Sequence, residues 1–138
     1  MRQLVYALLM VSMFAVGSTT AAAQEREPNN SCSTPQDLGT ISDRALITTG
    51  NLGVADGDFY KFTAAGATGL SAQFSDEVQL VFFDINCAPV IAIRIKGLTG
   101  LAFDPGTYVF GVVGGPAATT GPYMLALEPS VRTAPPEE

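Results

Sequence analysis

The chain of 138 residues contains no histidine and no tryptophan. Without histidine, it cannot form the Ser-His or Cys-His arrangements of nucleophilic enzymes, nor a histidine-based zinc site. Without tryptophan, it also lacks the stacking platform on which many carbohydrate-binding modules depend. The absence of histidine leads us to expect a protein that is not an enzyme, and the absence of tryptophan weighs against a typical carbohydrate-binding module.

Positive charge is scarce as well, with seven Lys and Arg residues against thirteen Asp and Glu residues. A surface of this sign repels nucleic-acid phosphates and anionic lipid headgroups. We therefore expect no nucleic acid among the partners of this protein.

Residues 4–16 form the one long apolar stretch, and about 13 residues are too few to cross a bilayer. Arg2 precedes this stretch, and the small residues Ala21-Ala22-Ala23 follow it, which is the pattern of a secretory signal with its cleavage site. We predict a signal peptide over residues 1–23. The mature protein would then be secreted or periplasmic, with no insertion into the membrane.

Cleavage after Ala23 leaves 115 residues, which suits one domain with one hydrophobic core. We expect this domain over residues 24–129. The tail, residues 130–138, is polar, acidic and rich in proline, and we predict that it is disordered.

Only two cysteines are present, Cys32 and Cys87. In an oxidising compartment such a pair can form a disulfide, and we predict this bond. Two free buried thiols are the alternative.

Short apolar or alternating runs, separated by glycine, proline, asparagine and aspartate, are typical of an all-β domain. Alternation in these runs predicts which side chains face the core, for example Tyr60 and Phe62, with Phe59 and Lys61 facing outward. Similar inward rows are expected at Leu70, Ala72 and Phe74, at Ile91, Ile93 and Ile95, at Tyr108, Phe110 and Val112, and at Tyr123, Leu125 and Leu127. The predicted strands cover residues 45–52, 58–64, 70–75, 79–85, 90–96, 98–103, 107–113 and 123–128.

Two short segments are rich in hard oxygen ligands of the kind that calcium prefers. The first contains Glu25, Glu27, Asn29 and Asn30, and the second contains Asp56 and Asp58. Taken singly, the first segment could be a polar linker and the second a solvated turn. Folding could also bring the two together.

The chain resembles the bacterial pre-peptidase C-terminal domains, whose relatives include the collagen-binding domains of clostridial collagenases. The resemblance lies in residues 27–31 (EPNNS), 56–62 (DGDFYKF), 105–110 (PGTYVF) and 123–127 (YMLAL). It implies a two-sheet, jelly-roll-like β-sandwich of about eight antiparallel strands. It also implies a structural calcium ion held by Glu25, Glu27, Asn29, Asn30, Asp56 and Asp58.

We therefore expect a non-catalytic exported module with structural calcium that binds an extracellular polymer or an envelope component. In collagen-binding relatives such binding uses exposed aromatic side chains, and Phe59 or an exposed tyrosine is a candidate here. An accessory or assembly protein that docks onto another exported protein is the alternative. A minimal hydrolase would require a pair of carboxylates in a concave pocket.

Overall fold

The fold consists of eight β-strands, as seen in a computed structural model that describes residues 21–53, 56–114 and 121–130. The strands are β1 (Ala21–Gln24), β2 (Gln36–Ile41), β3 (Leu46–Leu52), β4 (Gly57–Ala64), β5 (Thr68–Phe83), β6 (Pro89–Phe103), β7 (Gly106–Gly114) and β8 (Gly121–Pro129). Most of the predicted signal peptide and nearly all of the predicted disordered tail lie outside the described residues. The all-β prediction is confirmed.

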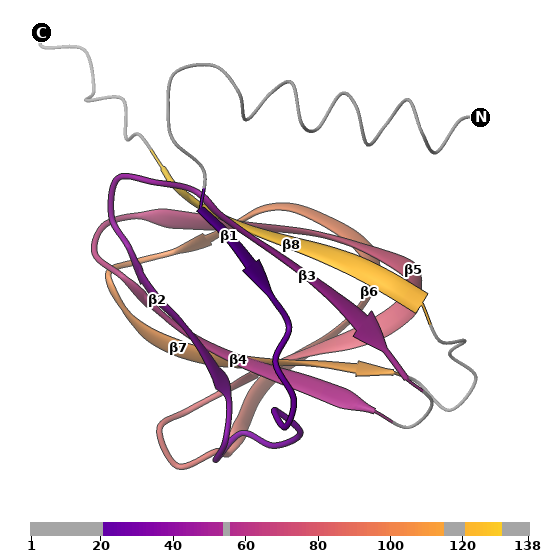
Figure 1. Cartoon of the computed structure of the whole chain (residues 1–138). Helices are drawn as coiled ribbons and strands as arrows, with labels where there is room; N and C mark the ends of the chain where they lie inside the picture. Colours follow the sequence, from indigo (N-terminus) through magenta and orange to yellow (C-terminus); the bar gives the residue numbers. More distant parts are fainter. Residues whose placement is uncertain (1–20, 54–55, 115–120, 131–138) are drawn as a thin grey trace, which may run out of the picture.

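The long strand β5 organises the sheet, whose strand order is β1-β3-β8-β5-β7-β4-β2 (Figure 1). β5 pairs with β8 over residues 68–74 and with β7 over residues 78–83, and an irregularity between Gln73 and Val78 separates the two halves. Because β5 changes partner there, the strands form two layers. One holds β1, β3 and β8, and the other holds β2, β4 and β7.

The strand directions correct one part of the prediction. The sheet is mixed, because β1 pairs with β3 in parallel and β2 pairs with β4 in parallel, while the other pairs are antiparallel. Both parallel pairs lie at the N-terminal end of the described chain. Three of the four residues of β1 precede the predicted cleavage point after Ala23.

The core lies between the two layers, and its central side chains are those that alternation predicted. Tyr60 and Phe62 on β4 are fully buried, as are Leu70 on β5 and Phe110 on β7. The ring of Phe62 packs edge-on against that of Phe110, with centroids 6.0 Å apart. Burial of these large apolar side chains supplies most of the stabilising free energy.

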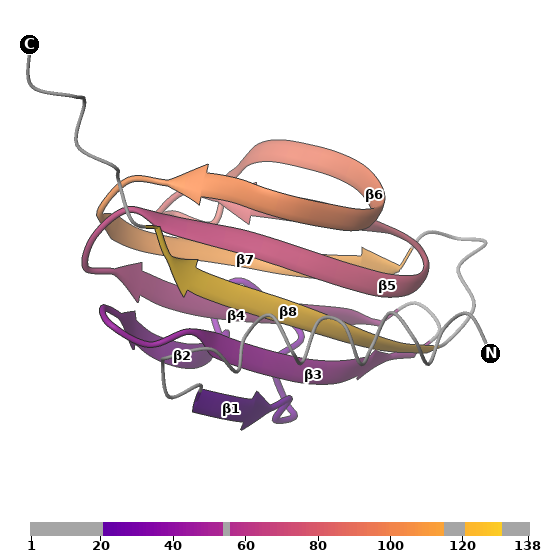
Figure 2. The same cartoon turned by 90° about the horizontal axis from the view of Figure 1, so that it is seen from above.

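The predicted inward row on β6 behaves differently from the others. Ile91, Ile93 and Ile95 pair with Phe82, Leu80 and Val78 of β5, whose side chains face the core. However, β6 is an edge strand, which lies beyond β5 in Figure 2, and Ile91 remains 55% exposed. The expectation that this whole row is buried is therefore wrong for Ile91.

The open side of the sandwich lies between β1 and β2, the two ends of the strand order. Here Gln36 connects the layers: its Nε2 donates to the Gln24 carbonyl (2.9 Å), and its Oε1 accepts from the Arg26 amide (2.7 Å). The segment between β1 and β2 thus runs across the opening. This segment carries the first predicted ligand group.

Candidate metal centre

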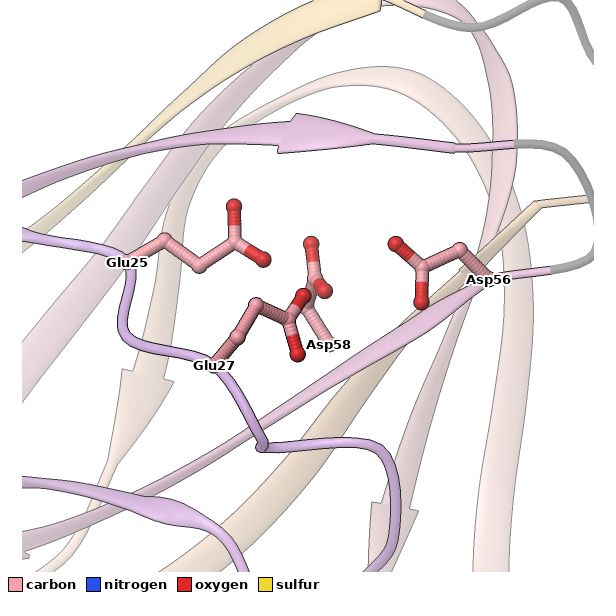
Figure 3. Close-up of side chains that lie close together, drawn as sticks. All are labelled: Glu25, Glu27, Asp56 and Asp58. Atoms are coloured by element: carbon pink, nitrogen blue, oxygen red, sulfur yellow. The ribbon is translucent and has the colours of Figure 1, made fainter.

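Folding brings the two acidic segments together at the open side of the sandwich. Glu25 and Glu27 come from the segment after β1, Asp56 precedes β4, and Asp58 belongs to β4. Their four carboxylates point toward one another, and one oxygen of each lies within 4.8 Å of the others (Figure 3). We call these four residues the acidic cluster.

Backbone pairing fixes the segment that carries the two glutamates. The Glu25 amide donates to the Thr49 carbonyl (3.0 Å), and the Phe59 amide donates to the Asn29 carbonyl (2.8 Å). The segment is therefore attached to β3 at one end and to β4 at the other. This attachment holds the Glu25 and Glu27 side chains over Asp58.

Asp58 is the innermost member of the acidic cluster and is fully buried. Its Oδ2 accepts a hydrogen bond from the Tyr123 hydroxyl (2.6 Å), and that hydroxyl is also hydrogen-bonded to the hydroxyl of Tyr60. Asp58 Oδ1 is buried without a hydrogen-bond partner. A buried carboxylate oxygen of this kind costs free energy unless a proton or a cation meets it.

The position of Tyr123 depends on a glycine. Gly50 on β3 is the cross-strand partner of Tyr123 on β8, and a Cβ at residue 50 would overlap the tyrosine ring. The missing side chain lets the ring lie flat on β3, so that its hydroxyl reaches Asp58. Sequence reasoning placed Tyr123 in a core row and missed this role. The available signal was its hydroxyl, since a buried tyrosine usually needs a hydrogen-bond partner.

Glu25 and Asp56 are held by backbone amides. Glu25 Oε2 accepts from the Asn51 amide (2.9 Å), and Glu25 Oε1 is buried without a partner. Asp56 accepts from the amides of Gly53 (3.3 Å) and Gly57 (3.0 Å). These bonds orient the carboxylates before any cation binds.

Two predicted ligands, Asn29 and Asn30, take different positions. Asn30 is exposed, and one atom of its side-chain amide lies 3.1 Å from Glu27 Oε2 and 3.3 Å from Asp56 Oδ1. With nitrogen at this point, the amide donates to both carboxylates. With oxygen there, it adds a fifth oxygen, which a proton on a neighbouring carboxyl or a cation would have to satisfy. Asn29 is fully buried, and neither polar atom of its side chain has a hydrogen-bond partner.

Burial and the proximity of other carboxyls raise the pKa values of Asp58, Glu25 and Glu27. Burial raises the pKa of Asp58, although a proton shared with the Glu25 carboxyl and the hydrogen bond from Tyr123 act in the opposite direction. Burial, followed by the neighbouring Asp58 carboxyl, raises the pKa of Glu25. For Glu27 the nearby Glu25 carboxyl is the main cause of a raised pKa. The acidic cluster therefore disfavours its own full ionisation.

The geometry fits a calcium ion. Calcium binds six to eight oxygens at about 2.3–2.6 Å, so oxygens on opposite sides of the ion are about 5 Å apart. The 4.8 Å span of the acidic cluster matches this spacing, and all four carboxylates offer hard oxygen ligands. The residues present therefore fit this ion.

The predicted disulfide joins Cys32 to Cys87, with Cα atoms 5.6 Å apart. It ties the segment that follows the acidic cluster to the turn between β5 and β6.

The described residues contain no helix that is long and apolar enough to span a membrane.

The comparisons with known proteins concern the fold. No sequence-family model and no curated protein matches the chain. The pre-peptidase C-terminal domain of a Bacillus anthracis collagenase is similar in structure, with a TM-score of 0.50 and 16% identity over 81% of this chain and 99% of that domain. The periplasmic g-type lysozyme inhibitor PliG of Aeromonas hydrophila gives a TM-score of 0.46 and 15% identity over 68% of this chain and 97% of the inhibitor. The expected resemblance is confirmed at the level of architecture: this chain has the fold of a pre-peptidase C-terminal domain.

Proposed function

We propose that this chain is a non-catalytic exported module whose N-terminal segment is held in place by a structural calcium ion. The observation that carries the proposal is Asp58, which is fully buried yet directs an unpartnered carboxylate oxygen into the acidic cluster. Glu25 Oε1 is a second oxygen of this kind. A divalent cation would satisfy both oxygens and neutralise the repulsion among four carboxylates.

The carboxylates have structural partners that suit a stabilising role. Asp58 is bound to Tyr123 in the opposite layer, and Glu25 is bound to the Asn51 amide of β3. A pocket of about 300 Å³ lies elsewhere, between β2 and β3, where Asp43 is the only carboxylate among the lining residues. The carboxylate pair that a minimal hydrolase requires does not line this pocket.

Export is supported by the bond between Cys32 and Cys87, because structural disulfides persist in oxidising compartments. A secreted or periplasmic location agrees with the predicted signal peptide. Calcium affinities of extracellular modules, with dissociation constants of about 10⁻⁴ to 10⁻³ M, would keep such a site filled outside cells.

The binding partner is an extracellular polymer or another exported protein. For a polymer, the outward-facing Phe59 offers little free aromatic surface: it is half-buried and lies 5.6 Å from the ring of Phe83. A Cβ at Gly111 would meet the ring of Phe59 at 2.7 Å, so the ring lies directly on β7. Phe59 therefore gives little support to a polymer partner, whereas the unpaired edge of β6 offers a surface for a protein partner.

Thermal unfolding in millimolar calcium and in chelator tests the calcium proposal. We expect calcium to raise the melting temperature of the wild-type protein, because an ion that binds only the folded state stabilises it. Asp56→Asn should lose most of this increase. Asp43→Asn, which makes the same charge change on an exposed loop, should keep it. Equal melting temperatures of the wild-type protein in calcium and in chelator would refute the proposal.

A further inference from the structure

The strand β6 presents a long unpaired edge. It pairs with β5 along its length, and no other strand of the described chain pairs with it (Figure 2). Its second edge therefore leaves a row of backbone amides and carbonyls open to solvent. Proteins usually protect such an edge, because it can bind another strand.

Among the described residues, the large apolar side chains that are exposed gather at the start of this strand. Ile85 in the preceding turn is 96% exposed, and Val90 and Ile91 on β6 are 64% and 55% exposed. Ile93 and Ile95 continue the row along the core-facing side and are partly buried. A strand added beside β6 would cover this row and extend the core by one strand.

The turn before β6 is fixed in advance. Asp84 Oδ1 accepts from the amides of Asn86 and Ala88, both at 2.9 Å, and the disulfide holds Cys87. The Asp84 amide also donates to the Ala88 carbonyl (3.0 Å). Little conformational entropy would be lost in this part of the molecule on binding.

The opposite face of the edge is basic. Arg94 and Lys96 are both exposed and alternate with the isoleucine row. The cross-strand neighbour of Arg94 on β5 is Gln79, which carries no charge, whereas Lys96 lies opposite the irregular part of β5 that contains Asp76 and Glu77. On a chain with nearly twice as many acidic as basic residues, this edge would attract carboxylates on an added strand.

We propose that the β6 edge, residues 90–96, binds an extended strand of a partner protein in which apolar side chains alternate with carboxylates. The apolar side chains would pack on Ile91, Ile93 and Ile95, and the carboxylates would pair with Arg94 and Lys96. A second copy of this chain is a poorer occupant, because pairing β6 with β6 would place two arginines and two lysines on one face. The proposal is independent of calcium, since the acidic cluster lies at the open side between β1 and β2, whereas β6 pairs with β5 at the middle of the strand order.

Selection from a library of random peptides about ten residues long, displayed on phage, tests this proposal. The bait is the oxidised wild-type protein in millimolar calcium. Enriched peptides should carry apolar residues at alternate positions with Asp or Glu between them, and should slow amide hydrogen exchange over residues 90–96. A selection without enrichment, a different pattern or protection elsewhere would overturn the proposal.

Charge reversal supplies the matched controls. The double variant R94E/K96E should bind the enriched peptides at least tenfold more weakly, whereas K61E on β4 should bind them as the wild type does. Equal affinity of R94E/K96E and the wild-type protein would contradict the proposal. A dimer in sedimentation experiments that is lost in R94E/K96E would show that the β6 edge binds a second copy of this chain, and this result would also overturn the proposal. Failure of the calcium proposal would appear separately, as equal melting temperatures of the wild-type protein in calcium and in chelator.

Discussion

The hydroxyl of Tyr123 donates to Asp58 across 2.6 Å and so joins β8 of one layer to β4 of the other. This bond links the acidic cluster to the hydrophobic core, because Tyr123 and Asp58 are both buried. Its acceptor is a carboxylate that has a second, unpartnered oxygen. Stability and metal binding should therefore respond together to changes at either residue.

Tyr123→Phe removes the donor to Asp58 and leaves both carboxylate oxygens without a proton donor. Hydrogen bonds to charged groups contribute about 1.5–3 kcal/mol, so we expect the free energy of unfolding to fall by about 2 kcal/mol in chelator. Urea denaturation measures this change. Tyr108→Phe is the control, since its hydroxyl donates to the Asp104 carbonyl (2.6 Å) at an exposed site, and we expect a smaller loss. Equal losses for the two variants would contradict the special role of Asp58.

Asp58→Asn should have opposite effects in the two metal states. Without calcium, the substitution removes a buried charge and keeps an oxygen that accepts from Tyr123, so the free energy of unfolding should rise by about 1 kcal/mol or more. With calcium, it removes a central ligand, and the stabilisation by calcium should disappear. Denaturation in chelator and in calcium measures both effects. A variant that is less stable than the wild type in chelator would contradict this account.

The raised pKa values predict the pH dependence of stability. Glu25, Glu27 and Asp58 have pKa values above their ordinary values of 4.5 and 3.8 in the folded protein. Between the ordinary and the raised values, the folded state binds more protons than the unfolded state, so stability increases as the pH falls through the raised pKa values. In chelator, the contribution of these groups to the free energy of unfolding should therefore increase on mild acidification from neutral pH.

Calcium should remove this gain, because the ion replaces the protons. Calcium affinity should also decrease as the pH falls, since protons compete for the same oxygens. Denaturation curves between pH 5 and pH 7, with calcium and with chelator, measure both trends. If the stability of the metal-free protein decreases steadily as the pH is lowered from 7 to 5, these carboxylates are not the dominant titrating groups.

The disulfide should stabilise the fold and the metal centre together. Replacing Cys32 and Cys87 with serine frees a loop with a sequence separation of 55 residues, for which the chain-entropy estimate is about 4 kcal/mol. It also frees the segment that carries Glu25 and Glu27, so calcium affinity should fall. Unfolding and calcium titration of the double variant measure the two effects, and reduced wild-type protein is the control. If the double variant binds calcium as tightly as the wild-type protein does, the disulfide does not contribute to the metal centre.

The sequence revealed the central strands well and the terminal ones poorly. β4 has strict alternation of buried and partly buried residues, which the apolar pattern reflects. β1 was missed because three of its four residues belong to the predicted signal peptide, and β2 was missed because it is short and polar and contains Gly39. Backbone pairing to β3 and β4 holds these two strands, and such pairing leaves little trace in a single sequence.

Two long strands were predicted as pairs of shorter ones. The polar residues Asp76 and Glu77 suggested a break, but β5 continues through them as an irregularity in its pairing. Gly97 similarly divided β6 in the prediction. Whether such a residue ends a strand or bends it depends on the layer that the strand joins next, which local sequence does not encode.

For the site, the ligand residues could be predicted from the sequence, but the contacts that support them could not. The four carboxylates were predicted from oxygen-rich segments, and the structure places them together. The contribution of Gly50 and Tyr123 depends on the pairing of β3 with β8 and could not be read from the chain. For Asn29, the structure shows a backbone contact to Phe59, and a side-chain role in metal binding stays a prediction.

Calorimetric titration of the metal-free protein with calcium tests the central claim most directly. We expect saturable binding with a dissociation constant of about 10⁻⁴ to 10⁻³ M, a release of protons that grows as the pH is lowered, and loss of binding in Asp58→Asn. The claim would be contradicted by a titration without saturable heat in the wild-type protein, or by equal binding in the wild type and Asp58→Asn.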